Sequence, residues 1–164
     1  MNRAVERLNL TRFTPLGRAR DLAVAVLRQT VEALAAGDSQ QASALLDQVV
    51  PESPDHTVAT VAGCIGVTLG LLDDWLPGHH PSAPPGIGDR VRLPAGHWTG
   101  ERAATDILAL ARTARAFRSL DRLIARHGGE HTLYGSVLAL TATVRRWADD
   151  TNSTLASTLL HHVR

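Results

Sequence analysis

The stretch TVATVAGCIGVTLGLL, residues 57–72, is the longest part of the chain without an acidic or basic side chain. Its apolar residues recur every three or four positions, which is the spacing of one face of an α-helix. A membrane span needs roughly 18 or more apolar residues, so a stretch of 16 is too short for one. We therefore expect a buried helix over residues 55–76, after the break at Pro51 and Pro54, at the centre of the fold.

Small residues form a stripe on this expected helix, at spacings of four, three and four. The stripe consists of Ala59, Gly63, Gly66 and Gly70. Each helical glycine costs about 1 kcal/mol relative to alanine, so three of them need a compensating contact. We interpret the stripe as a helix-packing groove into which another helix fits closely. The alternative is a small-molecule pocket beside Gly63 and Gly66, which would make the protein a sensor.

Helical periodicity extends in both directions from this segment, and no alternating strand pattern accompanies it. Further helices are expected at 16–36, 39–50, 101–127, 130–149 and from about 153 to 162. Gly37 is a plausible stop for the first of these, and Asp38 or Ser39 can cap the next. Asn152 or Ser153 can cap the last. The predicted fold is an all-α bundle of five to six helices, forming a single domain over residues 1–164.

A long loop, residues 77–100, separates the third and fourth main helices of this prediction. It holds five prolines, five glycines and three histidines, and residues 91–93 are expected to form one short strand. His79, His80 and His97 are weak candidates for a metal site, because histidine is a common zinc ligand. Their spacing matches no metal-binding motif, and the expectation is exposed histidines without metal or another cofactor.

Composition narrows the class of protein. The 164 residues are 44% hydrophobic and 20% charged, as in a soluble globular domain, and the N-terminus has no apolar signal-peptide run. Cys64 is the only cysteine, so there is neither a disulfide framework nor a cysteine-based zinc site. All 17 basic residues are arginine, a pattern typical of a GC-rich bacterium. We expect a cytoplasmic protein.

Catalytic sequence patterns are largely missing. The chain has no lysine for a phosphate-binding loop, no Gly-x-Ser-x-Gly elbow and no Glu-x-x-His pair. The paired carboxylates at 73–74 and 149–150 lie near expected helix ends, where solvated acids are common. These absences favour a binding protein over an enzyme.

Charge is unevenly distributed along the chain, although the formal net charge is only +1. Residues 1–28 carry six arginines and two acids, and residues 90–126 carry eight arginines and three acids. Residues 29–89 between them hold eight acids and no arginine, and residues 127–164 are balanced. A nearly neutral protein is thus predicted to have a basic surface and an acidic one.

Five arginines of the 101–127 helix fall within an arc of about 120°, opposite its apolar face. They are Arg112, Arg115, Arg118, Arg122 and Arg126. In one helix they would form a row roughly 20 Å long. Such a row suits an acidic protein surface, such as residues 29–89 of this chain or of a neighbour. It also suits the phosphates of nucleic acid. Plain solvation of the face is the remaining possibility. The leading hypothesis is a non-enzymatic, self-associating interaction or regulatory module that binds an acidic partner through this row.

The segment RHGGEH, residues 126–131, supports an alternative. It resembles the Arg-(polar)-x3-His motif of HEPN-type ribonucleases, which are helical domains of about this size. The resemblance implies metal-independent RNA cleavage, usually across a dimer interface, with Arg126 and His131 as the catalytic pair and Tyr134 nearby. A histidine that titrates near neutral pH can act as a general acid or base.

Overall fold

The protein is all-helical in its computed structural model, which describes residues 3–96 and 98–164. These residues form nine α-helices and one 3₁₀ helix, with an isolated bridge between Val50 and Thr60 but no strand. The all-α prediction is confirmed, whereas five to six helices are too few. The elements are α1 (Arg3–Phe13), α2 (Gly17–Ala35), α3 (Ser39–Asp47), α4 (Val61–Trp75), α5 (Ile87–Arg90), α6 (Glu101–Ala111), η1 (Phe117–Ser119), α7 (Leu120–His127), α8 (Gly129–Asp150) and α9 (Leu155–His162).

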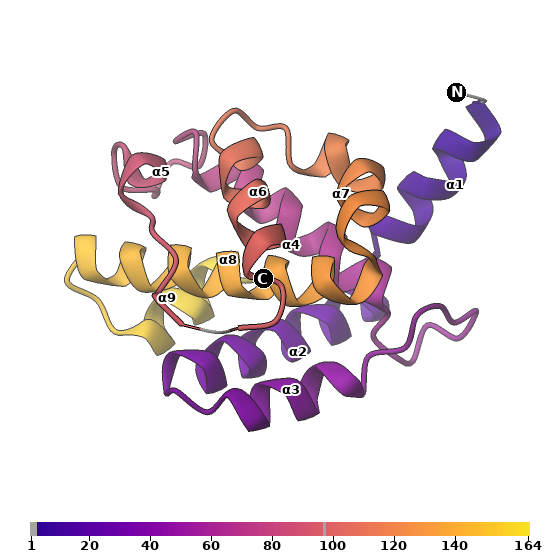
Figure 1. Ribbon diagram of the computed structural model, residues 1–164, viewed down its shortest axis with the longest axis horizontal. Helices are drawn as coiled ribbons and strands as arrows, with labels where there is room; N and C mark the ends of the chain where they lie inside the picture. Colours follow the sequence, from indigo (N-terminus) through magenta and orange to yellow (C-terminus); the bar gives the residue numbers. More distant parts are fainter. Residues whose placement is uncertain (1–2, 97) are drawn as a thin grey trace.

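Helix α8 runs through the middle of the fold and packs against α2, α4, α5, α6, α7 and α9 (Figure 1). Every residue from 132 to 144 is buried. Buried hydroxyls are tolerated there because each donates a hydrogen bond to a carbonyl three or four residues earlier. These hydroxyls belong to Thr132, Ser136, Thr141 and Thr143. The centre of the fold is therefore α8 together with α4, and not residues 55–76 alone.

Helix α4 contains the apolar stretch that the sequence singles out, but it begins six residues later than expected. The Asp55 carboxylate accepts hydrogen bonds from the backbone and hydroxyl of Thr57, which keeps this segment in a local turn. Thr60 then caps α4 by accepting from the backbone N–H of Gly63. Residues 62–69 are all buried. Within the described residues, no helix is both long enough and apolar enough to cross a membrane.

The end of α1 makes the closest approach to α4. A Cβ atom placed on Gly66 would overlap the backbone carbonyl of Phe13, whereas a Cβ on Gly70 would meet nothing within 4 Å. Gly63 lies against the side chain of Pro15. Ala59 precedes the first turn of α4. Gly63 and Gly66 thus face the junction between α1 and α2, and among the described elements no helix lies along the whole stripe.

The loop at 77–100 is more structured than its composition suggests. It contains the short helix α5, and the Arg112 side chain ties the loop to the end of α6. Arg112 donates from Nε to the Gly88 carbonyl at 2.7 Å and from Nη2 to the Val91 carbonyl at 3.2 Å. Residues 91–93 do not form the predicted strand, and the Val91 carbonyl accepts from the side chains of Arg92 and Arg112.

The predicted single helix over 101–127 is wrong. Helix α6 ends at Ala111, Ala114 takes a left-handed conformation (φ 53°), and η1 and α7 follow. The Asp73 carboxylate of α4 accepts hydrogen bonds from the backbone N–H groups of Ala116 and Phe117, both at 2.9 Å. It therefore starts a second helical segment in the way that a capping residue does. Asp73, expected to be a solvated acid, is half-buried and structural.

The C-terminal helix is held by a group of aromatic rings. His162 stacks on Trp147, with ring centroids 4.1 Å apart, and Trp147 meets Trp75 edge to face at 5.2 Å. His80 lies 5.5 Å from His162 and 5.7 Å from Trp147. Helix α9 begins at Leu155, where Thr154, one residue beyond the predicted caps, accepts from a backbone N–H.

We expect Gly66→Ala to lower the free energy of unfolding by about 1–3 kcal/mol, because its methyl group would overlap the Phe13 carbonyl and force α1 to shift. Gly70→Ala is the matched control. Its methyl group enters open space, so it should be neutral or stabilising by up to about 1 kcal/mol. Urea unfolding of both variants measures the difference. Equal stability would contradict close contact between α1 and α4.

Stability should fall as the pH drops below about 6.5, in part because of His162. Burial lowers the pKa of His162 from its ordinary 6.5, as do the charges of His80, His161 and Arg164. The unfolded chain therefore takes up a proton there before the folded chain does, and acid favours unfolding. His162→Phe keeps a ring against Trp147, and its Tm should decrease less between pH 7.5 and 5.5 than that of the wild type. The control is His56→Gln, a substitution in an exposed loop. Its Tm should decrease between pH 7.5 and 5.5 by as much as the Tm of the wild type.

Candidate functional site

The five arginines predicted to form one row have different surroundings in the structure. Arg112 is turned inward onto the carbonyls of the 88–91 loop, and Arg126 pairs through Nη1 with Asp106 at 3.2 Å. Arg115, Arg118 and Arg122 are exposed. Within the described residues, these three have no ion-pair or hydrogen-bonded side-chain partner. The row of five is thus reduced to three available guanidinium groups.

Arg115, Arg118 and Arg122 lie on one short segment despite the break after α6. Arg115 precedes η1, Arg118 lies in η1 and Arg122 lies in α7. The backbone N–H of Ser119 donates to the carbonyls of Arg115 and Ala116, which ties Arg115 to the start of this segment. We call these three residues the arginine face. No ion pair joins this face to the acids of residues 29–89 in the described part of the chain.

The segment that resembles the HEPN motif spans the junction between α7 and α8. Arg126 lies in the last turn of α7 and His131 in the first turn of α8, with Gly128 (φ 83°) between them. Asp106 Oδ2 contacts Arg126 and, at 2.8 Å, Nε2 of the largely buried His127. These contacts fasten α7 to α6. His131 is exposed, and the motif does not lie on one continuous helix.

The histidine candidates for metal binding are separated. His79 is exposed, His80 belongs to the aromatic group around Trp147, and His97 lies outside the described residues. His80 Nδ1 also accepts from the backbone N–H of Ser82 at 3.1 Å. In the described ranges, no group of three or more histidine, cysteine or carboxylate side chains is placed to hold a metal ion.

Two cavities open beside the glycines of α4. One, of about 740 Å³, is lined by Gly63, Pro15 and residues of the 51–58 loop. The other, of about 480 Å³, is lined by Gly66, Gly70 and Phe117. Neither concentrates charged groups to the extent of a third cavity on the other side of α8.

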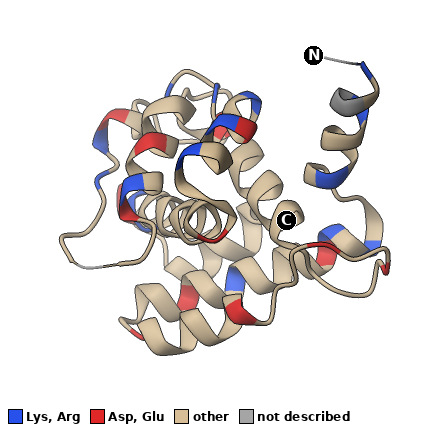
Figure 2. Ribbon diagram, turned by 45° about the vertical axis from the view of Figure 1, so that its right-hand side comes forward, with Lys and Arg blue, Asp and Glu red and all other residues tan. Residues whose placement is uncertain are grey.

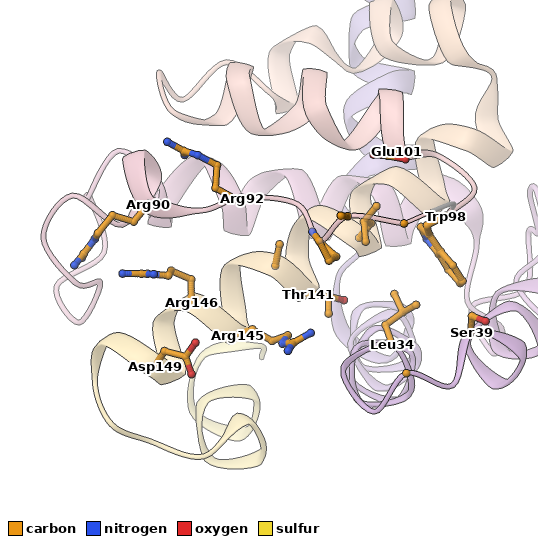
Figure 3. A pocket seen from close by; sticks show the side chains of 16 residues that line it. Leu34, Ser39, Arg90, Arg92, Trp98, Glu101, Thr141, Arg145, Arg146 and Asp149 are labelled. Atoms are coloured by element: carbon orange, nitrogen blue, oxygen red, sulfur yellow. The ribbon is translucent and has the colours of Figure 1, made fainter.

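This third cavity, which we call the basic cavity, has a volume of about 630 Å³ (Figure 3). It lies between the 90–98 segment, the C-terminal half of α8 and the turn that joins α2 to α3. Four arginines and two acids line it together with an apolar wall. The charged residues are Arg90, Arg92, Arg145, Arg146, Glu101 and Asp149, and the wall includes Leu34, Pro94, Ala95, Trp98, Leu138 and Ala142.

Three of these arginines already have partners. Asp150, whose side chain is only 9% exposed, lies 3.0 Å from both Arg90 Nη2 and Arg146 Nε. Arg90 also donates to the Pro85 carbonyl at 2.6 Å, and Arg92 donates to the carbonyls of Asp89 and Val91. These contacts position the 90–92 segment over α8.

Arg145 differs from the other three because it has neither an acidic nor a carbonyl partner among the described residues. It is exposed, and its guanidinium points toward Leu34 and Thr141 (Figure 3). Trp98 lies on the far side of Leu34 from Arg145, with its ring directed toward Ser39. An unpaired cation therefore faces an apolar wall across the basic cavity.

Three buried polar side-chain atoms lack a hydrogen bond in the described part of the chain. They are Trp98 Nε1, Arg146 Nε and Asp150 Oδ2. Arg146 Nε lies 3.0 Å from Asp150 Oδ1, and Arg90 Nη2 lies 3.0 Å from Asp150 Oδ2, so these two atoms have ion-pair partners. Buried polar groups in folded proteins are nearly always hydrogen-bonded, so the Trp98 N–H, which belongs to the lining of the basic cavity, is unusual among the described residues.

Sequence reasoning missed this cavity. The one available signal was the adjacent pair Arg145 and Arg146 at the end of a strongly apolar helix, where a buried face and a charged face must meet. Arg90 and Arg92 contribute to the basic block at 90–126, but their position beside α8 depends on how the 77–100 loop folds. That path is set by Arg112 and cannot be obtained from periodicity.

Comparison of the chain with protein-family models, curated proteins and solved structures finds no match.

Proposed function

We propose that the protein is a non-enzymatic, self-associating interaction module that binds an acidic protein surface through the arginine face. The observation that carries the proposal is the set of three exposed guanidinium groups on one short segment, residues 115–122, without acidic partners in the described residues. Arginine offers a planar fork of donors that matches carboxylates in pairs. The chain's own 29–89 segment holds eight acidic residues, which offer self-association a surface of opposite charge.

The surroundings of the arginine face favour a protein partner over single-stranded nucleic acid. Sequence-tolerant binding of single strands relies on aromatic side chains on which bases stack. Phe117, the aromatic residue beside these arginines, is packed against the hydrophobic core. Three arginines are also few for a duplex surface, where proteins often neutralise six to ten phosphates.

Charge reversal tests the proposal. Arg115→Glu combined with Arg122→Glu should weaken binding to a polyglutamate peptide at least tenfold, because two attractive contacts become repulsive. The control is Arg3→Glu with Arg7→Glu, the same change of charge on α1, which projects from the body (Figures 1 and 2). Fluorescence anisotropy at low salt measures affinity, and circular dichroism verifies the helical content. Unchanged affinity of the Arg115→Glu, Arg122→Glu variant for polyglutamate would contradict the proposal.

Single-stranded RNA provides the competing outcome. If Arg115, Arg118 and Arg122 alone contacted phosphates, log K would fall against log salt with a slope of about −2. If the protein binds RNA more tightly than polyglutamate, and if the double variant loses RNA binding, then the partner is nucleic acid and not an acidic protein. Cleavage of that RNA in the presence of a chelator, abolished by His131→Ala, would favour the ribonuclease alternative.

Self-association can be measured on the protein itself. We expect sedimentation velocity to show a larger species at high protein concentration that dissociates with added salt, because the proposed contact is between exposed charges. The Arg115→Glu, Arg122→Glu variant should remain monomeric. Monomeric behaviour of the wild type at all concentrations would remove self-association from the proposal.

A further inference from the structure

The basic cavity is separate from the arginine face in both residues and location. Its volume of about 630 Å³ is within the range of small-molecule sites, which are typically 300–1,000 Å³ and mostly apolar, with a few placed polar groups. The cavity has this composition, since Leu34, Trp98 and Leu138 contribute apolar surface and Arg145 an unpaired charge. Its charged groups allow the class of ligand to be narrowed.

The charged groups of the basic cavity favour a ligand with one negative charge over a ligand with two. Arg90 and Arg146 share the buried Asp150, and Arg92 is bonded to backbone carbonyls, which leaves Arg145 as the available guanidinium. Glu101 and Asp149 also line the cavity and would repel a doubly charged phosphate. A carboxylate can receive two parallel hydrogen bonds from one guanidinium.

The unsatisfied donor on Trp98 indicates where the rest of the ligand would lie. Its indole N–H is buried without an acceptor among the described residues, and its ring is tilted against Tyr134 at a centroid distance of 5.8 Å. An unsatisfied buried donor is unfavourable, and a ligand acceptor beside Trp98 would relieve it. An aromatic or aliphatic body there would cover the wall that the cavity exposes.

We propose that the basic cavity binds a small organic acid, with its carboxylate on the Arg145 guanidinium and its apolar body against Trp98 and Leu34. This site is independent of the arginine face, so either proposal can fail without the other. The protein would then sense a small metabolite of this class in addition to binding its partner.

Isothermal titration calorimetry with four probes tests the ligand class. Indole-3-acetate and octanoate should bind with Kd values of about 1 mM or below, a strength expected for ligands of this size. Inorganic phosphate tests charge without an apolar body, and tryptamine tests the same ring with a positive charge. Both should fail to bind measurably. Tighter binding of phosphate or tryptamine than of the two acids would overturn the proposal, as would no binding of either acid at 10 mM.

Arg145→Gln tests the anchor, because glutamine keeps hydrogen-bonding capacity but removes the charge. It should weaken indole-3-acetate binding at least tenfold, whereas Arg18→Gln, an exposed substitution on α2, should leave the Kd unchanged. Equal Kd values for Arg145→Gln and the wild type would exclude Arg145 as the anchor. Both variants should unfold at the wild-type temperature, since both side chains are exposed and neither makes a hydrogen bond or ion pair within the described residues.

Nuclear magnetic resonance of the indole N–H groups locates the ligand. The protein has three tryptophans, and Trp75 and Trp147 are buried in the aromatic group near α9. Titration with indole-3-acetate should shift the Trp98 resonance, which Trp98→Phe identifies by its loss, and leave the other two in place. Shifts confined to Trp75 or Trp147, or an unmoved Trp98 resonance during measurable binding, would place the ligand elsewhere and overturn the proposal.

Discussion

The burial of α8 on all sides is the constraint on which the rest of the structure depends. A helix with no solvent-facing stripe over residues 132–144 needs other helices around its whole circumference. The buried hydroxyls of this segment bond to carbonyls of the same helix and therefore need no partner from neighbouring helices. Gly135 lets the start of α6 approach closely, since a Cβ there would lie 2.7 Å from the Gly100 carbonyl oxygen. After Glu130 in its first turn, α8 next presents charged side chains to a surface near its C-terminal end, and the basic cavity lies there.

The second determining contact is the half-buried Asp73. Desolvation raises the pKa of this carboxyl, and the two backbone N–H bonds that it accepts act in the opposite direction. Those bonds start the helical segment that carries Arg118 and Arg122 and that Arg115 immediately precedes. An acid of α4 thus orients the arginine face, although it pairs with none of the arginines. The acidic and basic blocks of the sequence do meet, but through backbone N–H groups here and through the Arg12–Glu52 ion pair at α1.

The two proposed binding surfaces differ in how they are organised. The arginine face is exposed and formed by one short chain segment, so it suits a partner recognised mainly by charge. The basic cavity combines side chains from α2, α8 and the 90–98 segment around an apolar wall, so it suits a ligand recognised by shape as well as charge. The buried indole N–H of Trp98, which has no acceptor among the described residues, distinguishes this cavity from the two cavities beside the α4 glycines. Functional sites are common places for such local violations of the rules that govern the rest of a fold.

The sequence by itself determined the all-α class, the positions of α2, α3 and α8 to within a few residues, and the boundary at Gly128, because periodicity and capping are local properties. It also located the buried stretch of α4 and the uneven charge. Tertiary structure alone decided that the 101–127 segment divides, since the Asp73 carboxylate that starts its second half comes from a helix some 43 residues away in sequence. It likewise decided which arginines remain available and that Arg90 and Arg146 meet at Asp150. Helical periodicity describes which side of a segment is apolar, but the partner of a charged side chain depends on which distant segment folds against it.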